Sequence, residues 1–381
     1  MKIGVFLSKR ISTEGGGYTI TEEIVDALIS NINKNKSQSD FFFLINNDKN
    51  NLICSKLKKN KISYSKISES KGFKIIFTFT SHYFKWSNFL LNSLNILKIN
   101  NIFKDEKCDK ILFISSEHRE KIYTPYITTV WDMQHETHPE FAEVSSFGKK
   151  IYKKFVYNNF IKEADTVIVG TKVGKSEVIK YTKFNNKFLI LPHPVSNIFL
   201  KKKKIKSDKK KYFVYPANFW QHKNHINLLL GFKKFLKKNK QFILVLTGEK
   251  KNNYSKIIHK IDKLNIFNNV HIAGHVSTNK LINLYDKSFA VIYPSFSGPE
   301  NLPPLEALAR KKILINSLYP GAVEQLKKFP IYINPNSPMD IAKGMEKAKN
   351  TKLDKEKINF FLKSKSSKMY IENLLKELFK V

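Results

Sequence analysis

One stretch of the chain, Tyr293–Ala309, gathers residue types that can bind a phosphorylated ligand. We expect a strand to end at its first residue, and a proline-containing loop to lead to Glu300, Asn301 and Leu302 at the start of a helix. Backbone N–H groups at the start of a helix favour an anion. Glu306 follows on the first turns of that helix, where a carboxylate can accept hydrogen bonds from both hydroxyls of a ribose. The alternative is that the two glutamates only complement the helix dipole.

A second stretch, Tyr215–His225, lies between an expected strand and an expected helix. Lys223 is placed at this strand-to-helix turn, where a cation can neutralise a diphosphate and the helix N-terminus adds its dipole. Such groups stabilise the negative charge that develops on a departing nucleoside diphosphate. The alternative is a solvent-exposed lysine in a turn.

Two shorter groups follow expected strands in the first half of the chain. Gly16 and Gly17 come after the strand expected at Ile3–Leu7. Glycines let a backbone approach a ligand closely, although a flexible turn would use them equally well. Asp132 and His135 come after another expected strand. A histidine with a near-neutral pKa can hold an acceptor hydroxyl, and the alternative is a hydrogen-bonded structural histidine.

The elements that must position these groups alternate between short apolar runs and amphipathic stretches. This pattern predicts an α/β fold with two Rossmann-like doubly wound domains facing each other across a cleft. Ligands of such folds bind beyond the carboxyl ends of the strands, so we expect the site in that cleft. The expected strands are Ile3–Leu7, Phe41–Ile45, Ile111–Ile114, Ile127–Trp131, Thr166–Val169 and Phe188–Leu191, then Tyr212–Tyr215, Phe242–Leu246, Val270–Ala273, Ala290–Tyr293, Ile313–Ile315 and Ile331–Ile333.

Shifts in composition place the expected domain boundaries. An N-terminal Rossmann-like domain covers residues 1–196, and a lysine-rich linker without apolar period covers 197–211. A C-terminal Rossmann-like domain covers 212–364. The last residues, 365–381, form an amphipathic helix that we expect to pack back on the N-terminal domain.

The 381 residues carry a formal net charge of +35, from 67 basic and 32 acidic residues. Only three of the basic residues are arginine, the side chain that readers of nucleic acid favour, so we do not expect a nucleic-acid partner. The excess of lysine fits either a biased coding composition or docking on an anionic membrane surface. The docking face would consist of Lys56, Lys58, Lys59, Lys149, Lys150, Lys153 and Lys154.

The two cysteines stand in unrelated contexts, which argues against a zinc site or a disulfide framework. No apolar run of about 20 residues occurs, and the first residues read as a strand rather than as a secretion signal. The expected location is therefore the cytoplasm, including the cytoplasmic face of the membrane.

The run Leu302–Ala307 resembles the donor-site motif of the family 4 retaining glycosyltransferases, which have the GT-B fold. The resemblance is clearest over residues 212–341. It implies that Glu306 binds the ribose of a nucleoside diphosphate sugar and that Lys223 faces the diphosphate. It also implies that Gly274 lets the backbone pass close to the base. In the first half, Asp132 and His135 match a family pattern, His-Asp-Leu-Gln-His, and the glycine loop corresponds to one beside the donor phosphate and the acceptor.

Three positions depart from the family pattern. Gly298 stands where the family has its first glutamate, Asn218 where it has an arginine, and Trp131 where it has a histidine. Glu300 or nearby backbone N–H groups would then contact the donor sugar, and His222 or another lysine would replace the missing cation. The donor-binding residues expected on this basis are Gly16, Gly17, Asn218, His222, Lys223, Gly274, Glu300, Asn301, Leu302 and Glu306, and the catalytic ones are His135, Asp132, Lys223 and Glu300.

The function that these features predict is sugar transfer, with retention, from a nucleoside diphosphate sugar to a hydroxyl of a glycan or lipid-linked saccharide in surface polysaccharide synthesis. The resemblance implies a front-face mechanism and no metal or other cofactor, because the lysine and the helix N-termini take the place of a cation. One alternative is another GT-B enzyme, such as a nucleotide-sugar epimerase or a phosphorylase. The other is a non-catalytic polycationic protein that binds an anionic membrane or nucleic acid.

Overall fold

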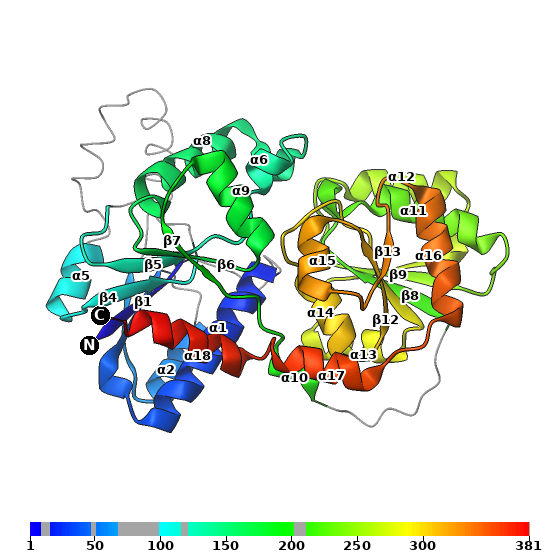
Figure 1. Ribbon diagram of the computed structural model, residues 1–381. Helices are drawn as coiled ribbons and strands as arrows, with labels where there is room; N and C mark the ends of the chain where they lie inside the picture. The colour runs from blue at the N-terminus through cyan, green and yellow to red at the C-terminus, as the bar shows by residue number, and fades with distance from the viewer. Residues whose placement is uncertain (9–15, 47–50, 68–98, 116–120, 202–210, 381) are drawn as a thin grey trace. The chain divides into compact units, whose positions relative to one another are not determined.

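The computed structural model describes residues 1–8, 16–46, 51–67, 99–115, 121–201 and 211–380. The chain divides into two units (Figure 1). Unit 1 consists of Met1–Pro194 with Ser367–Val381, and unit 2 consists of Val195–Ser366. Each unit is described by itself below.

Unit 1 is built on a parallel sheet whose strand order is β3-β2-β1-β4-β5-β6-β7. The order reverses direction between β1 and β4, so the carboxyl ends of these two strands mark the switch point where ligands of such sheets bind. The strands are β1 (Ile3–Leu7), β2 (Phe41–Asn46), β3 (Ser63–Ile67), β4 (Lys110–Phe113), β5 (Tyr126–Thr129), β6 (Thr166–Val169) and β7 (Lys187–Ile190). The helices are α1 (Gly16–Asn35), α2 (Asn51–Lys59), α5 (Ile99–Asp105), α6 (Gln134–Thr137), α7 (Ala142–Ser145), α8 (Phe147–Val156), α9 (Lys172–Thr182) and α18 (Ser367–Leu378), and a π-helical turn, Tyr157–Ile161, continues α8.

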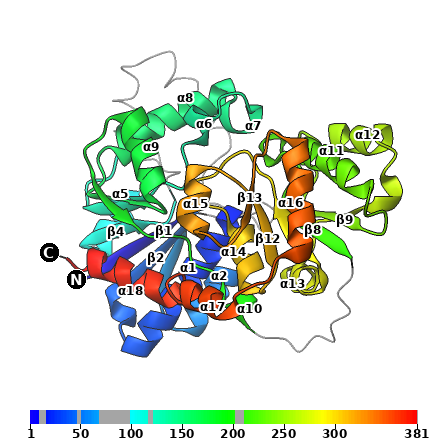
Figure 2. The same cartoon turned by 45° about the vertical axis from the view of Figure 1, so that its right-hand side comes forward.

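Unit 2 repeats this plan with the parallel strand order β10-β9-β8-β11-β12-β13, and its switch point lies between β8 and β11. The strands are β8 (Tyr212–Pro216), β9 (Ile243–Thr247), β10 (Val270–Gly274), β11 (Ala290–Tyr293), β12 (Ile313–Ser317) and β13 (Ile331–Ile333). The helices are α10 (Asn197–Leu200), α11 (His225–Leu236), α12 (Tyr254–Lys263), α13 (Thr278–Lys287), α14 (Leu302–Ala309), α15 (Pro320–Leu326), α16 (Pro338–Asn350) and α17 (Lys355–Lys363). Helices α11 and α16 lie side by side in both views (Figure 1, Figure 2). The predicted fold class, with two Rossmann-like doubly wound domains, is confirmed.

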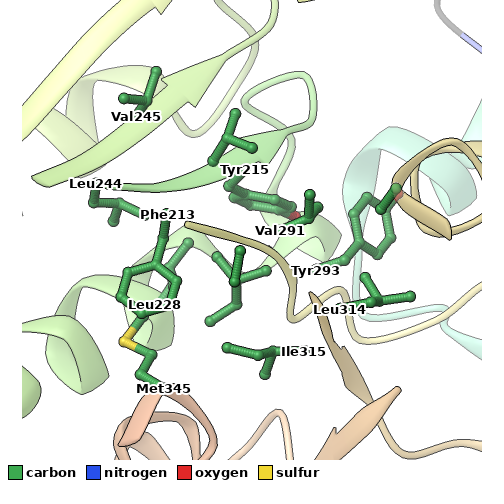
Figure 3. Close-up of a cluster of buried hydrophobic side chains, with 14 of the residues drawn as sticks. Phe213, Tyr215, Leu228, Leu244, Val245, Val291, Tyr293, Leu314, Ile315 and Met345 are labelled. Atoms are coloured by element: carbon green, nitrogen blue, oxygen red, sulfur yellow. The ribbon is translucent and has the colours of Figure 1, made fainter. Parts of the chain in front are cut away.

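The central strands of unit 2 are apolar on both faces because helices cover both sides of the sheet. Figure 3 shows part of this core, with Phe213 and Ile315 from the strands beside Leu228 of α11 and Met345 of α16. Tyr215 lies one residue before the end of β8 and Tyr293 ends β11, and both lie on the other side of this cluster from Met345 (Figure 3). Their rings meet edge to face with centroids 5.5 Å apart, and burial of such rings anchors the strand ends that carry the loops.

The segment predicted as a linker begins with structure rather than with solvated chain. Its first residues form α10, whose Phe199 is buried in the core of unit 2, while residues 202–210 lie outside the described part of the chain. The terminal helix α18 belongs to unit 1. There the Ser367 hydroxyl donates to Glu23 of α1, and the Thr166 hydroxyl donates to Glu377 across 3.2 Å.

Arg310 at the end of α14 fastens α10 to the body of unit 2. Its guanidinium donates to both carboxylate oxygens of Asp286 across 2.7 and 2.6 Å, and to the carbonyl oxygens of Phe199 and Lys201 across 2.9 and 2.6 Å. The arginine and aspartate side chains are only 7% and 9% exposed. Loss of one member of such a pair leaves a buried charge without its partner.

Replacing Arg310 by methionine is therefore expected to lower the free energy of unfolding by about 3–5 kcal/mol. Lys357→Met is the matched control, because its pair with Asp354 is exposed to solvent and contributes little to stability. Urea denaturation followed by tryptophan fluorescence measures both changes. Equal losses in the two variants would contradict the anchoring role.

Candidate functional site

The two predicted stretches of unit 2 flank its switch point. The loop after Pro216 leaves β8, and the loop after Tyr293 leaves β11, which is the neighbouring strand. The carbonyl oxygen of His222 joins them, because it accepts from the Phe296 N–H across 3.0 Å and from the Ser295 hydroxyl across 3.3 Å. Residues that are far apart in sequence thus form one polar surface at the carboxyl edge of the sheet.

Lys223 is held in this surface through its backbone and its side chain. The Tyr215 hydroxyl donates to its carbonyl oxygen across 2.5 Å, and the next residue, Asn224, has a left-handed backbone with φ of 60°. The ammonium group lies 3.0 Å from the Tyr293 hydroxyl and 3.3 Å from Oδ1 of Asn301. The side chain is partly buried, so its charge is less screened than that of a surface lysine.

The loop before α14 explains why glycine stands at position 298. Gly298 has φ of +133°, and a Cβ atom added there would lie 2.5 Å from Nδ2 of Asn301. A glutamate at this position would therefore have to displace the Asn301 side chain. Glu300 is partly exposed in the same loop, and its replacement of the family's glutamate stays a prediction.

Glu306 lies inside unit 2, on α14 below the loop. It is buried, and the Tyr285 hydroxyl of α13 donates to its Oε2 across 2.8 Å. Burial raises the pKa of Glu306 to about 7, and the hydrogen bond from Tyr285 opposes this rise. The carboxyl group is thus balanced between its neutral and its ionised form near physiological pH.

The other expected donor residues of unit 2 lie at the same edge of the sheet. Oδ1 of Asn218 accepts from the Glu249 N–H across 2.9 Å, so this side chain braces the loop after β9 rather than supplying a cation. His222 is buried in the turn that precedes α11, and Leu302 is the buried first residue of α14. Gly274 ends β10 with φ of +65°, and no atom lies within 4 Å of the place where a Cβ would stand.

In unit 1, Gly16 and Gly17 begin α1, which follows β1 at the switch point of this sheet. The Thr21 hydroxyl donates to the Gly17 carbonyl oxygen across 2.9 Å within the first turns. Gly15 and the rest of the preceding loop lie outside the described residues.

His135 differs from the expectation of a near-neutral pKa. It is buried on α6, and its ring centroid lies 5.3 Å from that of Tyr157. Burial, and next the charge of Lys153, lowers the pKa of His135 to about 4, so the imidazole is neutral at physiological pH. Asp132 stands two residues before α6, and its Oδ1 accepts from the Gln134 N–H across 3.0 Å.

Two further residues of this cluster were missed from the sequence. The π-helical turn places Tyr157 so that its hydroxyl donates to the Asp132 carbonyl oxygen across 3.2 Å. Burial, and next the charge of Asp132, raises the pKa of Glu177 on α9. Neither residue lies in a recognisable sequence motif.

The lysine face expected in unit 1 is partly engaged in contacts within the protein. Lys56 pairs with Asp26 at 2.7 Å, Lys150 pairs with Glu136 at 3.5 Å, and Lys149 donates to the Glu143 carbonyl oxygen across 2.6 Å. Of the expected face, Lys58, Lys59 and Lys154 are exposed and Lys153 is partly exposed. Membrane docking stays a prediction.

Within the described ranges, no three His, Cys, Asp or Glu side chains are grouped so that they could hold a metal ion. Across the same ranges, none of the helices combines the length and the apolar character needed to cross a membrane.

The comparison with family models decides what unit 2 is. The model of the glycosyl transferases group 1 family matches residues 196–365, which is nearly the whole of this unit. Unit 2 is a group 1 glycosyltransferase domain. The predicted resemblance is confirmed over these residues.

Comparisons with individual proteins agree with this domain family. The chain is 26% identical over 231 residues to the O-antigen chain mannosyltransferase RfbU of Salmonella typhimurium. This match spans 60% of the chain and 62% of the relative, which is less than two thirds of its length. Anabaena HepE, solved with UDP and glucose, superposes over all of both chains with a TM-score of 0.71 at 13% identity. A glycosyltransferase of Rickettsia africae ESF-5 superposes over 100% of this chain and 98% of its own with a TM-score of 0.69 at 17% identity. These likenesses show the GT-B class of fold.

Inside the group 1 domain, the motif residues depend on neighbours that the sequence did not reveal. Tyr293, Tyr319 and Gln325 contact Asn301, and Tyr285 contacts Glu306. Lys365, which follows α17, interacts with Glu300 of the motif. Burial lowers the pKa of Lys365, and the negative charge of Glu300, the next largest influence, opposes this shift.

Proposed function

We propose that this protein is a retaining glycosyltransferase that moves a sugar from a nucleoside diphosphate sugar to a hydroxyl of a glycan or lipid-linked saccharide. The observation that carries the proposal is the surface at the switch point of unit 2. There Lys223 and the start of α14 meet at the ends of adjacent strands, and the carboxyl group of Glu306 lies on the same helix.

Unit 2 would contact the donor at its ribose and at its diphosphate. The ionised carboxylate of Glu306 would accept hydrogen bonds from the two ribose hydroxyls. The diphosphate would lie against Lys223 and the N-terminal end of α14, where the charge and the helix dipole both favour an anion. This arrangement requires no metal ion for charge neutralisation, and we propose that none takes part.

The transfer step would rely on the same cation. As the bond between the anomeric carbon and the diphosphate oxygen breaks, negative charge grows on that oxygen, and Lys223 stabilises it. In a front-face mechanism the departing diphosphate itself accepts the proton of the acceptor hydroxyl, which attacks from the same side. No protein nucleophile is needed. In unit 1, Asp132 and the neutral imidazole of His135 would bind the acceptor through hydrogen bonds.

The names of similar proteins support a place in surface polysaccharide assembly. RfbU is an O-antigen mannosyltransferase, and WaaB, whose fold this chain shares, is a lipopolysaccharide outer core galactosyltransferase. HepE was solved with UDP and with UDP-glucose, which makes UDP the first nucleotide to test.

A panel of ligands tests the donor site directly. Thermal unfolding is measured with UDP, GDP, ADP, dTDP and pyrophosphate at physiological salt. We expect one nucleotide to stabilise the protein selectively, by about 2.7 kcal/mol at 100 times its dissociation constant. Equal stabilisation by all polyanions would contradict the proposal and favour a polycationic binding protein. Conversion of the sugar nucleotide without an acceptor would favour an epimerase.

A further inference from the structure

Asn301 lies at the centre of a hydrogen-bond network at the edge of the sheet in unit 2. Its Oδ1 accepts from the ammonium of Lys223 across 3.3 Å and from the Tyr293 hydroxyl across 2.9 Å. Its Nδ2 donates to the Tyr319 hydroxyl across 2.7 Å. Its backbone N–H and carbonyl group both bond to the Gln325 amide, across 3.1 and 3.0 Å. Side chains from three separate segments thus determine where this one amide points, and Gln325 of α15 holds the backbone of the same residue.

The network uses most of the hydrogen-bonding capacity of the Asn301 side chain. An amide oxygen has two lone pairs, and both have a donor here. Asn301 and Tyr293 are 9% and 2% exposed, so the arrangement is shielded from water. Its oxygen is therefore directed to the lysine and not to a bound sugar.

The partners of the Lys223 ammonium in this network are neutral oxygens. A lysine side chain has much rotational freedom, and holding its end in one place costs conformational entropy. A carboxylate partner would hold it too, but it would also cancel the positive charge. An amide and a phenol orient the ammonium without themselves cancelling its positive charge.

We propose that Asn301 is a positioning residue that holds the Lys223 ammonium in place for the diphosphate without neutralising it. Gly298 contributes to this arrangement because it leaves room for the Asn301 amide. A Cβ atom at position 298 would lie 2.5 Å from Nδ2 of Asn301. The proposal rests on the proposed function, in which Lys223 faces the diphosphate.

A purely structural role for Asn301 makes a different prediction. Asn301 is the N-cap of α14, and its side chain makes no capping hydrogen bond. Aspartate is as good an N-cap as asparagine and complements the helix dipole. Asn301→Asp would then leave ligand binding unchanged, whereas in the positioning role the new carboxylate pairs with Lys223 and weakens diphosphate binding.

Calorimetric titration separates the two roles. The dissociation constants of UDP, uridine and pyrophosphate are measured for the wild type, Asn301→Asp, Lys223→Met and the double variant. We expect Asn301→Asp to weaken UDP and pyrophosphate binding about tenfold and to leave uridine unchanged. The double variant should bind UDP no more weakly than Lys223→Met, because both changes remove the same interaction. Wild-type affinity for UDP in Asn301→Asp would overturn the positioning role alone. A wild-type protein that binds neither nucleotides nor pyrophosphate would instead overturn the proposed function, and the inference with it.

Gly298→Ala gives an independent test. The added methyl group should displace the Asn301 amide and reproduce the loss of pyrophosphate affinity. In an Asn301→Ala background the same change should have a much smaller effect on binding, because the displaced side chain is absent. Backbone strain at position 298 is common to both backgrounds, so it cancels in this comparison. Equal losses in the two backgrounds would contradict the proposal.

Discussion

Glu306→Gln is expected to weaken nucleotide binding about tenfold to a hundredfold and, at pH 8, to stabilise the empty protein. The loss of affinity follows from replacing an ionised acceptor of two hydroxyl hydrogen bonds by a neutral amide with one acceptor oxygen. The gain in stability follows from removing a buried group that resists ionisation. If Glu306→Gln weakens nucleotide binding and also stabilises the empty protein, Glu306 serves ligand binding and not stability.

The pH dependence of binding has a definite sign. Burial raises the pKa of Glu306 to about 7, so the carboxyl group of the empty site is mostly neutral below that pH. The ribose hydroxyls require the ionised form, which means that binding must release a proton there. Affinity for the nucleotide should fall up to about tenfold for each pH unit below 7 and level off above pH 8. The nucleotide affinity of Glu306→Gln should not show this fall below pH 7.

The pH dependence of stability has the opposite sense to that of an ordinary carboxylate. The folded-state pKa of about 7 lies above the unfolded value of about 4.3, so this group favours folding below pH 4.3. Its contribution is lost as the pH rises through 7. The free energies of unfolding of wild type and Glu306→Gln should therefore agree near pH 4 and diverge by pH 8. Glu356→Gln, an exposed change in the first turn of α17, is the control, and equal pH profiles for all three proteins would contradict the assignment.

Lys223→Met is expected to reduce turnover by about a hundredfold to a thousandfold, which is the cost of removing one group that stabilises developing charge. Two partners of its ammonium, Tyr293 and Asn301, are neutral and cannot replace the charge. Turnover is measured by release of the nucleoside diphosphate from the donor that the ligand panel selects. Because ground-state binding uses the same cation, the dissociation constant should rise as well, but by a smaller factor.

Lys357→Met serves as the matched control for this second prediction. It removes one positive charge from α17, where the side chain is 69% exposed and pairs with Asp354. If both variants lose turnover equally, the effect comes from the net charge of the protein and not from the site. If neither loses turnover, Lys223 is not the group that stabilises the departing diphosphate.

The sequence predicted the buried strands of each sheet well. The strands expected at Thr166–Val169, Ala290–Tyr293 and Ile331–Ile333 have these same bounds in the structure. They are largely buried parallel strands, and burial on both faces produces a continuous apolar run. The edge strand Ser63–Ile67 was missed because it is largely exposed, so its residues alternate too weakly to be recognised.

Helix ends and connections were predicted less well. Helix α14 begins at Leu302, among the residues expected at the start of a helix, because Pro303 and Pro304 fit its first turn. Helix α8, in contrast, continues into a π-helical turn that carries Tyr157. Hydrophobic spacing cannot reveal such a turn, since it depends on what packs against it.

The sequence alone determined which residue types could bind a nucleoside diphosphate and on which strand ends they stand. Motif spacing carries this information because a strand, a loop and a helix start are local features. Only the tertiary structure decided the state of these groups. It buried Glu306 and moved its pKa to about 7, it left His135 neutral, and it surrounded Asn301 with side chains from three separate elements. Charge state and side-chain orientation depend on desolvation and on partners distant in the chain, and these exist only once the sheet has assembled.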